Sequence, residues 1–300
     1  MTPSGPPAPP QTPPNPFVLP GDADGPLSHL KLSLVLYLDE PPGPEEARAV
    51  YNLYMASFGR HIREYLSTSW PGPPLPWDAA ARARFESSEL PALQDTVDWG
   101  YGFSSGTPMD AHLFMFHGYK PASEPGKASF FRFEWPWYWH HEHIFAFAVE
   151  VASAVPFLSG TAGYILQARP YEDAAYDYVY GKCRRYWGLE AWNLDATVDY
   201  VLEGYKCPSW LTLVGGRLLD QWESPADLSP LAAYATKIAG GYVFRARDVP
   251  DFIDRNYAAP YPGEQAIARV LAPLQITEHE PFGGEKWDED NTMEWLRRFE

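Results

Sequence analysis

Cysteine is scarce in this 300-residue sequence, which contains only Cys183 and Cys207. Two thiols cannot cross-link a chain of this length or supply a four-thiolate zinc site. Long apolar runs are also missing, since the longest near-apolar stretch, 144–158, is too short for a transmembrane helix and contains Glu150 and Pro156. The first residues lack the basic and apolar regions of a secretory signal. We therefore expect a cytoplasmic protein that does not insert into membranes.

Basic residues are outnumbered, with 23 Lys and Arg against 39 Asp and Glu, so the formal net charge is −16. Proteins that coat nucleic acid present a basic surface to the phosphates, and this balance argues against nucleic acid as a partner. It favours a neutral or basic partner. The hydrophobic content of 45% and the length of the chain are typical of a globular protein that buries a sizeable core.

The two ends of the chain differ in composition from the middle. Ten of the 32 prolines fall in residues 1–26, where no hydrophobic period is visible, and this predicts a flexible or extended arm outside the core. Residues 277–300 carry eight acidic and three basic side chains around two tryptophans, which predicts an acidic tail in the form of a solvated helix or a docking segment. Residues 27–276 are expected to form a single domain, or two sub-domains that meet near residue 170.

Hydrophobic periodicity predicts an α+β fold, with a mixed or antiparallel sheet and helices packed on it. The elements expected in the first half are a strand over 30–38, a helix over 45–66, a short helix capped by Asp78, strands over 111–119 and 128–135, a buried helix or strand over 142–155, and a strand over 161–169. This order predicts a ferredoxin-like split βαβ core. A C-terminal extension is expected to add a helix over 172–187, strands near 210–214 and 242–247, and a helix over 264–271.

The clearest candidate for metal chemistry is a run of imidazoles, His140, His141 and His143. Imidazole is a common metal ligand, and on a helix His140 and His143 share a face, to which His112 or His117 from a strand would add a third ligand. The spacing does not match the zincin motif, whose two histidines are four residues apart with Glu beside the first. The alternative is a helix N-terminus with half-exposed imidazoles beside a tryptophan-rich part of the core.

Aromatic residues are unusually frequent, with 12 Trp, 19 Tyr and 16 Phe. Most must be buried, because aromatic side chains contribute large areas to a protein core. The run WPWYW at 135–139 is longer than one strand end can cover, and partly exposed Trp and Tyr are the usual anchors of protein interfaces. The aromatic content therefore favours a protein with a rich core and a partner-binding surface.

The segment 182–222 contains an Arg-Tyr-Trp-Gly-Leu-Glu sequence and, further on, a Trp-Leu-Thr strand followed by glycine and leucines. The residues that carry this pattern are Arg185, Tyr186, Gly188, Leu189, Glu190, Trp210, Leu211, Thr212, Gly215 and Leu218. In these residues the chain resembles the type VI immunity family of bacterial toxin-immunity proteins. The resemblance extends over roughly residues 28–275, with the arm and the acidic tail outside it.

The resemblance implies a non-enzymatic protein without a cofactor, which binds and neutralises a cognate toxin encoded nearby and delivered by type VI secretion. The motif residues are expected to be structural. From the residues alone, two alternatives stay open: a metal-dependent enzyme that uses His140, His141 or His143, and an adaptor whose proline-rich arm docks on another module. The acidic charge fits the immunity interpretation, because it would steer association with a basic toxin.

Overall fold

The computed structural model describes residues 13–23, 25–67, 73–93, 98–106, 112–221, 228–257 and 261–300, so residues 1–12 and 24 of the predicted arm lie outside it. The strands are β1 (Ser28–Leu38), β2 (Glu64–Ser67), β3 (Leu75–Pro76), β4 (Asp98–Ser104), β5 (Leu113–Tyr119), β6 (Ser129–Pro136), β7 (Ser159–Ala168), β8 (Leu189–Ala191), β9 (Leu211–Gly215), β10 (Ala235–Ile238) and β11 (Gly241–Arg245). The α-helices are α1 (Pro44–Phe58), α2 (Ala79–Arg84), α3 (His141–Ala154), α4 (Asp173–Arg185), α5 (Leu194–Thr197), α6 (Gly216–Asp220), α7 (Pro262–Leu271) and α8 (Glu289–Leu296).

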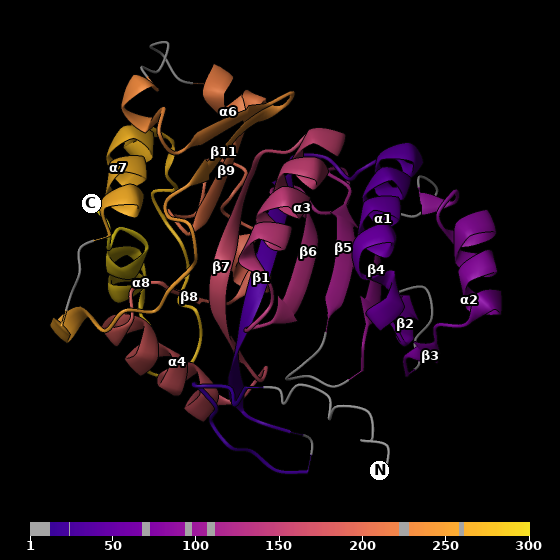
Figure 1. Cartoon of the computed structure of the whole chain (residues 1–300), viewed down its shortest axis with the longest axis horizontal. Coiled ribbons are helices and arrows are strands. Elements are labelled where there is room, and N and C mark those ends of the chain that lie inside the picture. Colours follow the sequence, from indigo (N-terminus) through magenta and orange to yellow (C-terminus); the bar gives the residue numbers. More distant parts are fainter. Residues whose placement is uncertain are drawn as a thin grey trace, which may run out of the picture.

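One sheet runs through the whole molecule (Figure 1). Its strand order is β10-β11-β9-β7-β1-β6-β5-β4-β2-β3, and β8 pairs with β7 off this path. The pairings along the path are antiparallel, and β7 with β8 is parallel. Segments from both halves of the sequence therefore share one sheet.

Strand β1 occupies the middle of the sheet and has two different faces. Successive side chains of a strand point to opposite sides, so its five leucines fall together in the main apolar core. The other face carries Lys31 and Ser33 before it becomes apolar at Val35 and Tyr37. Both faces of β1 are buried, which explains its nearly continuous apolar sequence.

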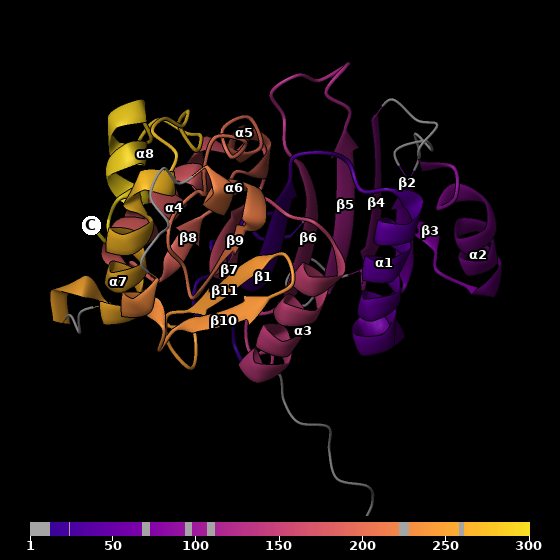
Figure 2. The ribbon, with the colours of Figure 1, turned by 90° about the horizontal axis from the view of Figure 1, so that it is seen from above.

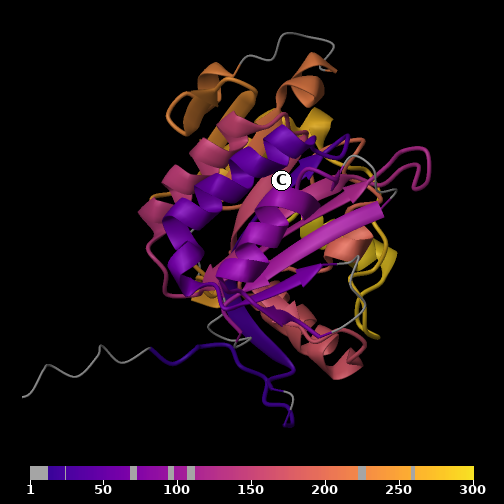
Figure 3. The same cartoon turned by 90° about the vertical axis from the view of Figure 1, so that its right-hand side faces the viewer.

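Helices α1 and α3 pack side by side on the leucine face of β1 (Figures 2 and 3). Helix α1 begins at Pro44, and Glu45 and Glu46 follow in the first turn, where the helix dipole favours carboxylates. Its buried side is aromatic, with the ring of Tyr54 centred 4.9 Å from that of Phe114. Each such ring removes roughly 150–250 Å² of surface from water, which stabilises the contact between helix and sheet.

The opposite face of the sheet buries a network of charges. Glu134 of β6 is fully buried and accepts hydrogen bonds from Lys31 of β1 and from Nε of Arg132, the latter at 2.7 Å. The guanidinium of Arg132 lies 4.9 Å from the centre of the Trp192 ring. Beyond this network, apolar side chains of α5 and the residues after it cover the sheet (Figure 2).

The α+β class and the mixed, largely antiparallel sheet confirm the sequence prediction. The ferredoxin-like detail is not confirmed, since a split βαβ arrangement has four strands and this sheet adds further strands on both sides of them. Here β1 runs antiparallel to both neighbours, with Leu34 opposite Phe133 of β6 and Ala162 of β7. The strands β2, β3 and β4, which follow α1, extend the sheet beyond β5.

The helix predicted over 45–66 is too long. Helix α1 ends at Phe58 with Gly59 as its C-cap, and Tyr65 lies in β2. Strand β4 was not predicted, because its two glycines weaken strand propensity, although the buried Tyr101 and Phe103 alternate as strand residues do. The segment 142–155, for which helix and strand were both open, is helix α3.

Among its described residues, the proline-rich arm contributes Phe17 to the core. Phe17 is buried, and its ring is centred 5.0 Å from those of Tyr186 and Phe252. Asn15 fixes the arm to the sheet, because its side chain bonds both the backbone N–H and the carbonyl of Leu30. The prediction that the arm lies wholly outside the core is therefore wrong for Phe17.

The acidic tail is packed on the rest of the chain through α8. Trp287 and Trp295 are almost completely buried, with ring centres 6.1 Å apart. Asp288 caps the helix by accepting a hydrogen bond from the Asn291 backbone at 2.7 Å. Helix α8 is thus amphipathic, with exposed carboxylates on one side and tryptophan on the other. No helix in the described ranges is long and apolar enough to cross a membrane.

Candidate interaction surface

The first half of the sequence motif lies where α4 meets β8. Arg185 ends α4, and its Nε donates a hydrogen bond to Asp254 at 2.7 Å, which lowers the pKa of that carboxyl. Tyr186 forms a β-bridge with Asp254. A Cβ on Gly188 would stand 1.9 Å from the carbonyl oxygen of Asp251, so only glycine fits there. Together these residues fasten the loop after β11 to the end of α4.

The next two motif residues, Leu189 and Glu190, belong to β8 and are buried. Glu190 accepts a hydrogen bond from the Ser209 hydroxyl and a longer one, at 3.3 Å, from the hydroxyl of Thr161. Because buried polar groups need partners, this carboxylate ties β8 to β7 and to the turn before β9.

The second half of the motif forms β9 and the turn into α6. Its members are all buried: Trp210, Leu211, Thr212, Gly215 and Leu218. A Cβ on Gly215 would stand 1.7 Å from the carbonyl oxygen of Phe157, so the chain comes too close here for any side chain. These contacts support the proposal that the motif residues are structural rather than catalytic.

The imidazole run begins helix α3, with His140 as N-cap and His141 and His143 in the first turn. Nε2 of His141 is 3.3 Å from the Tyr164 hydroxyl, whereas the ring of His143 packs 4.9 Å from that of Phe58. The side chains are therefore directed to different neighbours. Within the described ranges, no three metal-ligating side chains gather in a group that could hold an ion. The metal-enzyme alternative is not supported.

His112, a possible third ligand in that alternative, belongs to a stack of rings. Its ring lies parallel to that of His61 with centres 4.1 Å apart, and edge-on to Trp139 at 4.6 Å. His112 is 4% exposed, and burial lowers its pKa to about 3.

The two cysteines are also poor candidates for chemistry. Cys183 and Cys207 are free and fully buried. Burial raises the pKa of Cys183 to about 12 and also raises that of Cys207. A thiol reacts as its thiolate, so neither residue is a nucleophile at neutral pH.

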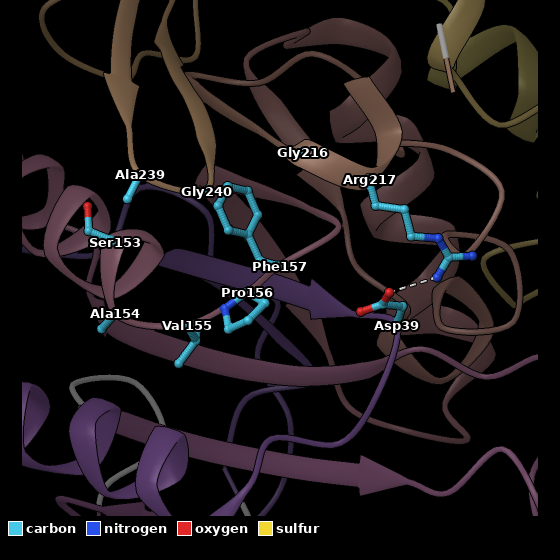
Figure 4. A pocket seen from close by; sticks show the side chains of 10 residues that line it. All are labelled: Asp39, Ser153, Ala154, Val155, Pro156, Phe157, Gly216, Arg217, Ala239 and Gly240. Atoms are coloured by element: carbon cyan, nitrogen blue, oxygen red, sulfur yellow. Dashed lines mark hydrogen bonds and ion pairs between the residues drawn. The ribbon is translucent and has the colours of Figure 1, made fainter. Parts of the chain in front are cut away.

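A shallow groove lies where β1 ends, and we call it the Asp39 groove (Figure 4). It consists of depressions of about 400 and 340 Å³ that share Asp39 and Pro156. Phe157 stands in the middle of its floor, and Gly240 of the β10–β11 turn lies beside the ring. The carboxylate of Asp39 accepts a hydrogen bond from Nη1 of Arg217 at 2.8 Å. Three segments far apart in the sequence thus form one groove.

A second, more acidic groove lies beside α8, and we call it the Glu280 groove. It consists of depressions of about 300 and 330 Å³ that share Glu280. The carboxylates that line it are Asp195, Glu278, Glu280, Glu289 and Asp290. Arg132 is the single lysine or arginine among the described lining residues, and its guanidinium already binds Glu134.

Aromatic side chains accompany these carboxylates. Tyr200 lines the groove, and partial burial together with the nearby Glu280 and Glu278 raises its pKa. Tyr171 at the rim is 99% exposed and has a φ of 64°, an unusual conformation for a residue with a side chain. Tyrosine is one of the residues that are enriched in protein interfaces.

Neither groove could be read from the sequence. Asp39 was recognised as the end of a strand, but nothing linked it to Pro156, Arg217 or the turn at Gly240. The carboxylates of the Glu280 groove were visible only as part of a general excess of acid, because they come from α5, α8 and the loop before α8.

Comparison with known proteins places the chain in a family. The matching family model is TsiV, described as type VI immunity for VRR-NUC, and it covers residues 49–299. The match extends past residue 275, where the resemblance described from the sequence ends, and it includes most of the acidic tail. No curated protein matches the chain.

Among solved structures, the Pseudomonas aeruginosa T6SS protein PA0821 is similar to this chain with a TM-score of 0.73. The two share 16% sequence identity, and the match covers 93% of this chain and 85% of the other. At this level of identity the likeness establishes a common fold. Since the family model spans most of the sequence, the protein belongs to the TsiV family of type VI immunity proteins for VRR-NUC.

Proposed function

We propose that this protein acts by binding a cognate VRR-NUC effector in the cytoplasm and blocking it, without catalysing a reaction. The observation that carries the proposal is the TsiV match over residues 49–299, which includes nearly every described element of the fold. The single continuous sheet supports the further proposal that residues 27–276 act as one unit rather than two.

The charge of the molecule fits a basic partner. With a net charge of −16, the chain attracts a positively charged protein over a distance, which raises the association rate at low salt. A protein that cleaves nucleic acid needs a basic surface for phosphates, and carboxylates can occupy such a surface in place of phosphates. The five carboxylates of the Glu280 groove are the densest acidic lining of the grooves described above.

The chemistry of the described residues supports a binding role. The buried thiols have raised pKa values, and the histidines of α3 contact separate neighbours. The buried carboxylates Glu134 and Glu190 are both engaged by hydrogen bonds within the sheet. These groups are committed to holding the fold, and exposed carboxylates and aromatics are left for a partner.

The proposal is tested by co-expression. Each gene adjacent to this one is expressed in a heterologous bacterium, alone and together with the full chain, and growth is measured. One neighbour should be toxic alone and tolerated with the chain. A matched control is the Trp295→Ala variant, which removes a buried ring from the core and should lower protection by lowering the amount of folded protein. Failure of the intact chain to protect against every toxic neighbour would contradict the proposal.

A further inference from the structure

The Asp39 groove has an apolar floor and acceptor groups at its edge. Phe157 and Pro156 form the floor, and the end of α3 forms one wall through Ser153, Ala154 and Val155 (Figure 4). The last turn of a helix leaves backbone carbonyls without partners inside the helix. Within the described part of the chain, no donor is found for the carbonyls of residues 151–154, and the last turn contains no basic residue.

The groove is also negatively charged. Asp39, Glu40 and Glu46 line it, and the one cation among its lining residues in the described chain, Arg217, is paired with Asp39. The carboxyl end of the α3 dipole adds partial negative charge from the other side. Glu40 is exposed and is therefore available to a partner.

We propose that the Asp39 groove receives a lysine or arginine side chain of the protein effector, with the methylene stem on Pro156 beside the Phe157 ring and the cationic head at the carboxylates of Asp39, Glu40 and Glu46. The proposal rests on the proposed function, since it names a contact surface for that effector. Long basic side chains cover apolar surface with their stems while their charge stays at the polar edge. An acidic or purely apolar side chain would leave the acceptors of this groove unpaired.

A larger side chain substituted at Gly240 would fill the groove and can therefore be used to test the proposal. A Cβ built on Gly240 stands 3.8 Å from Cε1 of Phe157 and 3.9 Å from the carbonyl oxygen of Ala152, which are ordinary contact distances. A leucine at this position would lie on the floor and exclude the incoming side chain. Gly181 on α4 has no atom within 4 Å of such a Cβ, so Gly181→Leu is the matched control on a surface away from the groove.

The experiment measures binding of the full chain to the neighbouring effector, produced by cell-free synthesis, by surface plasmon resonance at several salt concentrations. Gly240→Leu should weaken binding at least tenfold, and Gly181→Leu should change it less than twofold. Glu40→Lys should weaken binding at least tenfold, whereas Glu203→Lys, an exposed residue on the segment that covers the opposite face, should have a much smaller effect. Thermal unfolding establishes that each variant is folded.

Different outcomes overturn different claims. If the wild-type chain binds but folded Gly240→Leu binds equally well, the groove is not the contact surface, and the proposed function stands. If Gly240→Leu weakens binding while Glu40→Lys acts no more strongly than Glu203→Lys, the occupant is not cationic and the proposal is wrong. If the wild-type chain binds no neighbouring effector, the proposed function fails and the groove proposal fails with it.

Discussion

The carbonyl oxygen of Asp251 occupies the space that a side chain on Gly188 would need, since a Cβ there would stand 1.9 Å away. The same glycine donates its backbone N–H to the Tyr261 hydroxyl at 3.2 Å. The loop after β11 is therefore pressed against the start of β8, and the glycine of the sequence motif is the residue that permits this approach. Close packing, rather than chemistry, accounts for this motif position.

Gly188→Ala should lower the free energy of unfolding by about 3 kcal/mol, because either the loop or β8 must move to make room for the methyl group. The measurement is urea denaturation. Gly181→Ala is the matched control: it lies inside helix α4 with open space around it, and alanine should stabilise the chain by about 0.5–1 kcal/mol. Equal, small effects of both substitutions would contradict this account of Gly188.

The buried charges on the sheet give a second prediction. Burial alone would raise the pKa of Glu134, but Arg132 and Lys31 lower it to about 2, so the group is ionised at neutral pH. Glu134→Gln leaves two cations with a neutral partner in a buried site and should cost about 3–5 kcal/mol of stability. Replacing Lys31 and Glu134 together by methionine and leucine should cost less than Glu134→Gln, as measured by urea denaturation. A larger cost for the double variant would contradict this prediction.

The stability of the protein should fall as the solution is acidified. His112 has a pKa of about 3 in the fold against about 6.5 in the unfolded chain, so below pH 6.5 only the unfolded state takes up the proton. Its contribution is intact above pH 6.5 and decreases by about 1.4 kcal/mol per pH unit down to pH 3. His279, with a pKa of about 4, acts in the same direction.

His112→Phe should therefore flatten the dependence of unfolding free energy on pH between 6.5 and 4.5. The phenyl ring can keep the contacts with Phe58 and Trp139 but cannot be protonated. Urea denaturation at four pH values in this range gives the slope for each protein. An unchanged slope in the variant would mean that His112 is protonated equally in the folded and unfolded states.

The acidic tail gives a fourth prediction. Trp295→Ala should cost about 3–5 kcal/mol, because a fully buried indole is replaced by a cavity. The neighbouring Glu294 is 66% exposed and pairs with Arg184 at the surface, so Glu294→Ala should cost less than 1 kcal/mol. Thermal or urea unfolding distinguishes the two, and equally mild effects would mean that α8 can leave the core without consequence.

The elements predicted best from the sequence are those with a long, regular apolar pattern. Strand β1 was expected at 30–38 and occupies Ser28–Leu38, and the helix expected at 172–187 is Asp173–Arg185. Strand β4 was missed because Gly100 and Gly102 obscure its alternation, and the end of α1 was misplaced because apolar residues continue at helical spacing past Phe58. A local pattern shows which residues are buried. It does not show where a turn ends a helix and a strand begins, and helices and strands have different hydrophobic periods.

The outer strands of the sheet and the grooves could not be predicted for a different reason. Strands β2, β3 and β4 pair with one another and with β5, and a local pattern contains no information on such pairings. The Asp39 groove joins the end of β1 with residues more than 110 and 170 positions away, Pro156 and Arg217. The resemblance in 182–222 could be recognised from the sequence because the close backbone approaches at Gly188 and Gly215 require glycine at fixed positions within a short segment.

The central claim is that this chain neutralises an effector by binding it. The most direct measurement is the affinity of the purified chain for the effector encoded beside it, together with the nuclease activity of that effector with and without the chain. The account predicts a one-to-one complex with a Kd in the nanomolar range or below, weakened by added salt, and loss of nuclease activity at equal concentrations. An effector that stays fully active and unbound at micromolar concentrations of the folded chain would contradict it.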